Sequence, residues 1–139
     1  MIKVLSQEEL ALRWLEIKPY IDKAVEHGIN ETSSMDMFKG AMNNTYHCVE
    51  VINNNNKTVA FSMLRVNYFE NHSQLQIVTA TASSKDEWET YAKESLQYAE
   101  DTAKQIGCKY VTIWGRPGWV KRLKHFGYDH TYTVMTKEV

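Results

Sequence analysis

The sequence has little of what would tie it to a membrane, to an oxidising compartment or to nucleic acid. No apolar run approaches the length of a membrane span, and the start, Met1-Ile2-Lys3-Val4, lacks the apolar stretch of a signal peptide. A net charge of -1, from 16 basic and 17 acidic residues, gives no global electrostatic reason to bind nucleic acid or an anionic membrane. We therefore expect that the protein resides in a reducing cytoplasm. A virion protein that is made in the cytoplasm would have the same sequence features.

Cysteine is scarce and histidine is scattered. Cys48 and Cys108 lie far apart in the chain, so two reduced, buried thiols are the simplest interpretation, with a disulfide or a reactive thiol as the alternatives. None of the five histidines belongs to an H-E-x-x-H or a Cys/His zinc spacing. We expect no metal site.

The composition is that of a folded domain. Apolar residues make up 43% of the 139 residues and aromatic residues 12%, which argues against disorder. The sequence contains no internal repeat and no linker. It therefore predicts a single domain over residues 1–139.

The last third of the chain predicts a strand, a sharp turn and a short helix. The apolar run Tyr110 to Trp114 meets Gly115-Arg116-Pro117-Gly118, and a basic segment follows that closes at Gly127. Proline suits the first turn of a helix, and glycine suits the position just past its end. The helix is therefore expected from Pro117 to Phe126.

A longer helix is expected just upstream, from Asp86 to Gln105. Ser84 and Glu87 have the spacing of a capping box, and Gly107 provides the stop. Its apolar face must bury against something, and β-like segments lie on both sides, Gln74 to Ala82 before it and Tyr110 to Trp114 after it. The helix therefore predicts a right-handed crossover on a sheet.

The front half predicts helices and then a hairpin. Ser6 and Glu9 form a capping box for a helix over Gln7 to Glu26, in which Pro19 predicts a kink or two consecutive helices near Lys18. The further elements expected are a helix over Met35 to Met42 and strands over Thr45 to Ile52 and Lys57 to Val66, joined by an asparagine turn at Asn53 to Asn56. The apolar residues of the helix over Met35 to Met42 are expected to pack in the core or, alternatively, to line a site for an apolar substrate.

This order of elements resembles the GNAT superfamily of acyl-CoA-dependent N-acetyltransferases. A last strand over Thr131 to Met135 completes the order, and the ending Leu123 to Tyr128 is similar to the Leu-Gly-Phe type of ending in that family. The resemblance implies an α/β (α+β) fold in which about four helices flank a central twisted sheet, mixed but mostly antiparallel. The Gly115-Arg116 turn and the helix after it are also similar to small GNAT-like proteins of tailed phages, some of which are carried inside the particle.

The resemblance places the acetyl-CoA pyrophosphate at Ala82, Ser83, Ser84 and Lys85, if the cofactor binds. Active family members have a glycine-containing loop here, whose N–H groups lead into the long helix. This chain has no glycine there, and Asp86 and Glu87 place carboxylates in the first helical turn, where they would repel a pyrophosphate. We therefore expect no cofactor, and acetyl-CoA only if the chain is an enzyme.

The family's catalytic residues are also replaced. Many members have a tyrosine four residues before the closing glycine and an asparagine seven residues before that tyrosine, and these positions are Leu123 and Arg116 here. The strand over Gln74 to Ala82 contains no acid that could accept the amine proton. Tyr128, Tyr132 and His125 lie nearby in the sequence, and of these Tyr128 and His125 are the candidates for proton transfer.

Two classes of function follow. In the first, the domain is non-catalytic and works as an interaction or structural protein, of the kind found in phage particles. Its partner is then a protein, and the candidate contact residues are Trp114, Arg116, Trp119, Lys121 and Arg122. In the second, the chain is a divergent N-acetyltransferase that acts on an amine. The basic segment Lys121 to His125 fits a solvated helix face, a phosphate contact or a dock for an acidic partner, and the sequence specifies neither acceptor nor oligomeric state.

Overall fold

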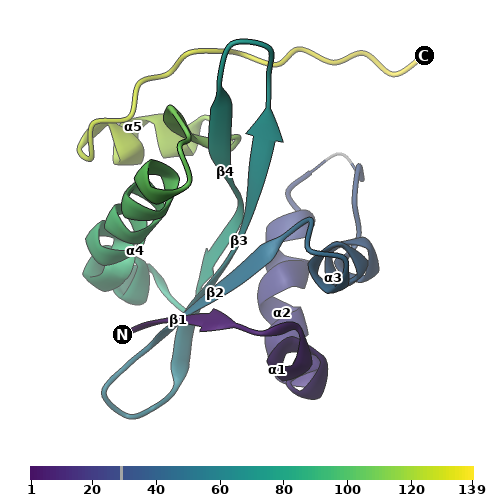
Figure 1. Cartoon of the computed structure of the whole chain (residues 1–139), viewed down its shortest axis with the longest axis vertical. Coiled ribbons are helices and arrows are strands. Elements are labelled where there is room, and N and C mark those ends of the chain that lie inside the picture. Colours follow the sequence, from purple (N-terminus) through teal and green to yellow (C-terminus); the bar gives the residue numbers. More distant parts are fainter. Residues whose placement is uncertain (29) are drawn as a thin grey trace.

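The computed structural model describes residues 1–28 and 30–139, which form a five-stranded sheet with helices on both faces (Figure 1). The strands are β1 (Ile2–Leu5), β2 (His47–Ile52), β3 (Thr58–Tyr68), β4 (Ser73–Ala82) and β5 (Tyr110–Ile113). They lie side by side in chain order, antiparallel from β1 to β4, with β5 parallel to β4. The expected mixed, mostly antiparallel sheet is confirmed.

The helices divide between the two faces of the sheet (Figure 1). One face carries α1 (Gln7–Leu12), α2 (Trp14–Val25) and α3 (Ser34–Met42), and the other carries α4 (Lys85–Gln105) and α5 (Gly118–Lys124). The alternation of strand side chains feeds both cores: Cys48, Phe61 and Met63 face the first group, and Val49, Leu64 and Ile77 face the second. Among the described residues, no helix is long and apolar enough to cross a membrane.

Several local signals of the sequence work as expected. The capping box of Ser6 and Glu9 opens α1, and Gly107 and Gly127 have positive φ values of 79° and 85° where α4 and α5 end. In the hairpin between β2 and β3, Asn56 adopts a φ of 60°. The asparagine turn is confirmed, because asparagine tolerates the left-handed region better than most residues do.

Two features of the front half differ from expectation. The strand β1 was not predicted, because four residues at the chain start carry little local signal and become a strand only by pairing with β2. The first helical region breaks at Arg13, not near Lys18, and Pro19 lies inside α2. Arg13 has non-helical angles, with φ -104° and ψ 17°, and its side chain is held by Glu50 of β2.

The C-terminal end also differs. Pro117 caps α5 and the helix runs from Gly118 to Lys124, shorter than the predicted Pro117 to Phe126. Residues 131–135 do not form the expected strand and are fully exposed. A strand needs a hydrogen-bonded neighbour, and the tail leaves the body without meeting one (Figure 1).

Candidate cofactor site

The strands β4 and β5 separate part-way along their length. They pair from Gln74 to Ile77 on β4 and from Tyr110 to Ile113 on β5. Beyond that point β4 continues to Ala82, paired only with β3, while the chain leaves β5 at Trp114. The side of β4 that faces away from β3 therefore has an unpaired edge at residues 78–82, and this opening is the splay that a ligand could enter.

A β-bulge lies where the splay begins. Met63 pairs with Thr79 and Leu64 with Ile77, so Val78 is an extra residue in β4. The Thr79 hydroxyl accepts a hydrogen bond of 3.2 Å from the Met63 amide. Bulges bend a strand and are over-represented next to active sites, which makes the splay the leading candidate site in the fold.

The predicted cofactor residues Ala82, Ser83, Ser84 and Lys85 come together at the junction of β4 and α4, and most of their polar groups are used. The Ala82 carbonyl accepts a hydrogen bond from Lys23, and the Ser83 amide donates one to Val59 of β3. The Ser84 hydroxyl accepts a bond of 3.1 Å from the Glu87 amide, so Ser84 caps α4 as predicted. These hydrogen bonds within the chain use polar groups that an open phosphate-binding loop would leave free for its ligand.

The charges at this junction do not favour an anion. Asp86 and Glu87 lie in the first turn of α4, where their carboxylates interact favourably with the helix dipole. Lys85 is the cation of this turn, and its ammonium lies 3.9 Å from Glu89. A diphosphate placed here would meet three carboxylates and one shared ammonium.

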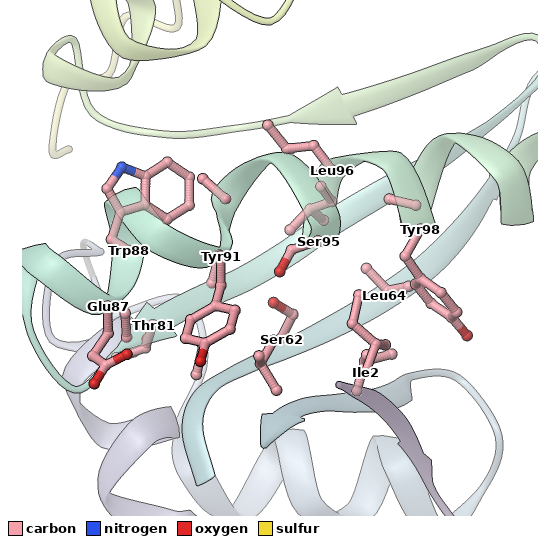
Figure 2. A pocket seen from close by; sticks show the side chains of 18 of the residues that line it. Ile2, Ser62, Leu64, Thr81, Glu87, Trp88, Tyr91, Ser95, Leu96 and Tyr98 are labelled. Carbon is pink, nitrogen blue, oxygen red and sulfur yellow. The ribbon is translucent and has the colours of Figure 1, made fainter. Parts of the chain in front are cut away.

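The space between α4 and the sheet is narrow (Figure 2). The cavity has a volume of about 50 Å³ and is almost entirely apolar, with Ala80 and Ala82 of β4, Trp88 and Ala92 of α4, and Ile113 of β5 among its walls. Figure 2 shows Tyr91, Ser95 and Tyr98 on the side of α4 that faces β3 and β1.

Two tryptophans join α4 to α5. The rings of Trp88 and Trp119 meet edge to face, with centroids 4.9 Å apart and an interplanar angle of 87°. Trp119 also packs against Gly115, where an added Cβ would lie 2.7 Å from the indole. Gly115 is therefore required for the close approach of this ring, a role that the sequence did not reveal.

The two catalytic candidates, Tyr128 and His125, do not line the cavity. Burial, and then the charge of Glu100 beside it, raise the pKa of Tyr128, so its hydroxyl stays protonated. That hydroxyl is buried and forms no hydrogen bond of normal geometry with the described residues. His125 is the exposed C-cap of α5, and Leu123, at the position of the family's tyrosine, is a core residue.

The predicted interaction residues lie around the β5–α5 turn and on α5, and four of the five are exposed. These are Trp114, Arg116, Lys121 and Arg122, with 64% of Trp114 accessible. Trp119 is half-buried between Trp88 and Arg122, whose guanidinium lies 6.0 Å from the centroid of the indole ring. Trp119 is thus a packing residue, and Trp114 is the exposed tryptophan of the turn.

Sequence reasoning missed a buried ion pair under α2. The guanidinium of Arg13 donates two hydrogen bonds, of 2.7 and 2.8 Å, to the Glu50 carboxylate, whose side chain is 0% exposed. Burial alone would raise the pKa of Glu50, but the bonds from Arg13 and Thr58 outweigh it and lower the pKa. An acid in the middle of an apolar strand, Glu50 of His47–Ile52, was the signal that could have revealed it.

The cysteines and histidines form no site in the described part of the chain. Cys48 is buried and Cys108 half-buried, both as free thiols, and burial raises the pKa of Cys48 to about 12. No group of three or more histidine, cysteine or acidic residues could hold a metal ion among the residues described.

Comparison with known proteins supports the fold and not a specific activity. No protein-family model and no curated protein sequence matches the chain. Solved structures do match. A GNAT family acetyltransferase from Staphylococcus aureus has a TM-score of 0.67 and 18% identity, and the match covers 100% of this chain and 98% of that one. Glucosamine-6-phosphate N-acetyltransferase from Arabidopsis thaliana has a TM-score of 0.70 and 12% identity, covering 99% and 97%.

A ribosomal-protein-alanine N-acetyltransferase from Brucella melitensis biovar Abortus matches with a TM-score of 0.75 at 8% identity, covering 100% of this chain and 99% of that one. Identities this low establish the architecture and leave the chemistry open. This chain adopts the GNAT fold, the fold of these N-acetyltransferases.

Proposed function

We propose that this protein uses the GNAT fold without transferring acetyl groups and works as an interaction protein. One observation carries the proposal: Trp88 of α4 and Trp119 of α5 meet edge to face, which joins the two helices between which a pantetheine arm would lie. An acetyl-CoA molecule with its diphosphate at the start of α4 and its thioester at the splay would have to pass between these helices.

The size of the cavity supports this proposal. The cavity between α4 and the sheet, of about 50 Å³, is small for a pantetheine arm. An arm placed between α4 and α5 would in addition require the two indole rings to separate, with loss of their mutual contact, which is worth roughly 0.5–1.5 kcal/mol beyond the area that it buries. Trp119 would also have to leave its contact with Gly115.

The charges at the start of α4 support it too. A diphosphate gains from a helix N-terminus because free N–H groups and the positive end of the dipole face it. Here Ser84 already satisfies the Glu87 amide, and Asp86 and Glu87 place their own negative charge beside that end. One of the first-turn amides is thus used within the chain, and two carboxylates weaken the attraction of this helix end for an anion.

The surface proposed to bind a partner surrounds the turn after β5. Trp114, Arg116, Lys121 and Arg122 are exposed there. Tryptophan and arginine are the residue types that most often dominate protein interfaces, and the basic charges suit an acidic partner. The resemblance to phage proteins predicts a component of a phage particle as that partner, and this stays a prediction.

A second candidate is a divergent N-acetyltransferase, and the splay is the specific observation that favours it. The unpaired edge of β4 at residues 78–82 offers backbone groups to which an extended pantetheine arm could hydrogen-bond in the manner of an added strand. The amides of Lys85 and Asp86 donate no hydrogen bond within the described part of the chain and could face a phosphate. In this candidate Tyr128 or His125 would transfer the proton, although both would have to approach from outside the cavity.

Calorimetric titration with acetyl-CoA separates the two candidates before any acceptor is known. The proposal expects no saturable heat at millimolar ligand. Saturable binding to the wild-type protein that Ser84→Asp abolishes, and that the equally charged exposed control Asn55→Asp leaves intact, would place acetyl-CoA at the start of α4, favour the enzyme candidate and contradict the proposal.

A further inference from the structure

The sheet contains an arginine with no carboxylate beside it. Arg65, in the second half of β3, is the one charged residue of β3, β4 and β5. It is half-buried, and none of the ion pairs in the described part of the chain includes it. Taking a guanidinium out of water without a counter-charge is costly, so a residue of this kind calls for a physical reason.

Arg65 points away from α4 and α5. Its neighbours Leu64 and Val66 pack into the core beneath α4, and side chains alternate along a strand, so Arg65 lies on the face that carries α1 to α3. The register places Gln76 of β4 opposite Arg65, and Thr112 of β5 opposite Gln76, on that same face. Figure 1 shows β3 and β4 continuing past α2 and α3 towards their hairpin, so this end of the face extends beyond those helices.

Gln76 is oriented by two donors. The Arg65 guanidinium and the Asn67 side-chain amide both donate to the side-chain oxygen of Gln76, over 2.9 and 2.7 Å. A guanidinium can only donate, so the oxygen of Gln76 must face it and the NH₂ group must point away. Gln76 is 4% exposed, and its NH₂ group has no acceptor among the residues that the structure describes. A nearly buried glutamine thus presents two unused N–H donors.

Arg65 has unused donors as well. Its Nε–H is buried and finds no acceptor in the described chain. Its Nη1 lies 3.5 Å from the Tyr46 hydroxyl, beyond the usual length of a hydrogen bond. Buried polar groups in native proteins nearly always have a partner, so an orphan donor is a candidate contact for a ligand.

Tyr46 holds the guanidinium in place. The centre of its ring lies 5.6 Å from the guanidinium carbon of Arg65, in the range of a cation–π contact. The ring in turn packs on α3, where a Cβ added to Gly40 would lie 2.3 Å from it. Gly40 is therefore needed for this packing, which fixes the position of Tyr46. Groups that are held in place before binding give up less conformational freedom when a ligand arrives.

The unused donors fit a carboxylate. Within the described residues these are the Nε–H of Arg65, the NH₂ group of Gln76 and the hydroxyl of Tyr46. An oxyanion accepts strong, charge-assisted hydrogen bonds from such a group. One guanidinium balances one negative charge, so a carboxylate matches it, whereas a phosphate dianion would keep an unbalanced charge in a half-buried place.

An aromatic surface adjoins these donors. Tyr110 lies two residues before Thr112 on β5, and hence on the same face, and it is 49% exposed. The ring of His72 meets it edge to face, with the ring centroids 5.1 Å apart. An apolar or aromatic body attached to the carboxylate would pack against this surface.

We propose that Arg65, Gln76 and Tyr46 bind the carboxylate of a small carboxylic acid, whose apolar body lies over Tyr110. The site is on the opposite face of the sheet from the cavity between α4 and the sheet. The proposal therefore does not depend on whether acetyl-CoA binds.

Sodium benzoate is a suitable probe, and benzamide is its uncharged counterpart of nearly the same shape. ¹H–¹⁵N spectra at constant ionic strength follow the Nε–H signal of Arg65 and the side-chain NH₂ signals of Gln76. We expect saturable shifts of both with millimolar benzoate and none with benzamide. No saturable shift up to the solubility limit of benzoate, or equal shifts with benzamide, overturns the proposal. Tighter binding of inorganic phosphate would contradict the assignment to a carboxylate.

Gln76→Glu separates a binding role from a structural one. It places a carboxylate of nearly the same shape beside Arg65, so the fold should be kept while the affinity for benzoate falls by about tenfold or more, because like charges repel. The matched control Gln105→Glu makes the same change at the exposed last residue of α4 and should bind benzoate as wild type does. Thermal unfolding followed by circular dichroism shows that each variant is folded.

A second variant removes the positive charge itself. Arg65→Gln should abolish saturable binding of benzoate, whereas Lys93→Gln, which removes a charge at an exposed position of α4, should not. If either Gln76→Glu or Arg65→Gln is folded and binds benzoate as tightly as the wild-type chain, the ligand lies elsewhere and the proposal is wrong.

Discussion

Trp88 of α4 and Trp119 of α5 meet edge to face with their ring centroids 4.9 Å apart. The contact joins α4, the helix that follows β4, to α5, the helix that follows β5. The chain keeps the opening between β4 and β5, while the cavity between α4 and the sheet has a volume of about 50 Å³. The predictions below test this contact, the buried ion pair and the state of the buried thiol.

The tryptophan contact should be measurable as a coupling free energy. In a double-mutant cycle of Trp88→Ala, Trp119→Ala and the double variant, we expect a coupling of about 1 kcal/mol, the usual value for an aromatic pair. Denaturant unfolding monitored by circular dichroism gives the four free energies. Strictly additive single changes would mean that the rings do not stabilise each other.

Removing the buried carboxylate of the Arg13–Glu50 pair should destabilise the fold more than removing an exposed partner of Arg13. Glu50→Ala should lower the free energy of unfolding by roughly 3 kcal/mol, because it leaves a guanidinium that is largely buried without its carboxylate. Glu16→Ala is the matched control, since Glu16 pairs with the same Arg13 at 3.0 Å but its side chain is 56% exposed. That change should cost at most about 1 kcal/mol. Equal losses for the two variants would contradict the assignment.

The pH dependence of stability should carry the signature of Glu50. Its pKa is lowered from 4.5 in the folded protein, so the unfolded chain binds more protons around and below that pH. The stabilisation by Glu50 is complete above its unfolded pKa and is lost as pH falls through the folded value. The stability difference between wild type and Glu50→Gln should therefore be constant from neutral pH to about pH 5 and shrink below it. A difference that grows on acidification would have the wrong sign.

The two thiols should react differently with a thiol reagent. Burial raises the pKa of Cys48 to about 12, and its side chain is 3% exposed, so neither a thiolate nor access is available near neutral pH. Native protein should leave Cys48 unlabelled after long exposure to the reagent, and denatured protein should label both cysteines. Peptide mapping by mass spectrometry identifies the site, and rapid native labelling of Cys48 would contradict its place in the core.

The local parts of this fold could be predicted from the sequence. Ser84, Gly107 and the apolar stripe between them define α4 almost to the residue, and Gly127 marks the end of the last helical region. Each of these signals acts through neighbours within four residues. The order of elements from α3 to α5 was confirmed for the same reason, whereas β1 was not expected and the strand over Thr131 to Met135 does not form.

The parts that depend on distant partners could not be predicted. The helix break moved to Arg13 because Glu50, 37 residues away, holds its side chain. Residues 131–135 have the composition of a strand, but no strand lies beside them in the single chain. In the candidate site, the missing glycine and the added acids were visible in the sequence, whereas the contact of Trp88 with Trp119 joins residues far apart in the chain.

The central claim is that the chain's own side chains occupy the place of the cofactor between α4 and α5. A two-dimensional ¹H–¹⁵N spectrum recorded during a titration with acetyl-CoA tests it at the residues concerned. We expect the amides of Ser83 to Glu87 and the indole N–H signals of Trp88 and Trp119 to stay in place up to millimolar ligand. Saturable shifts of these amides together with both indoles would show the cofactor bound at the junction and contradict the account.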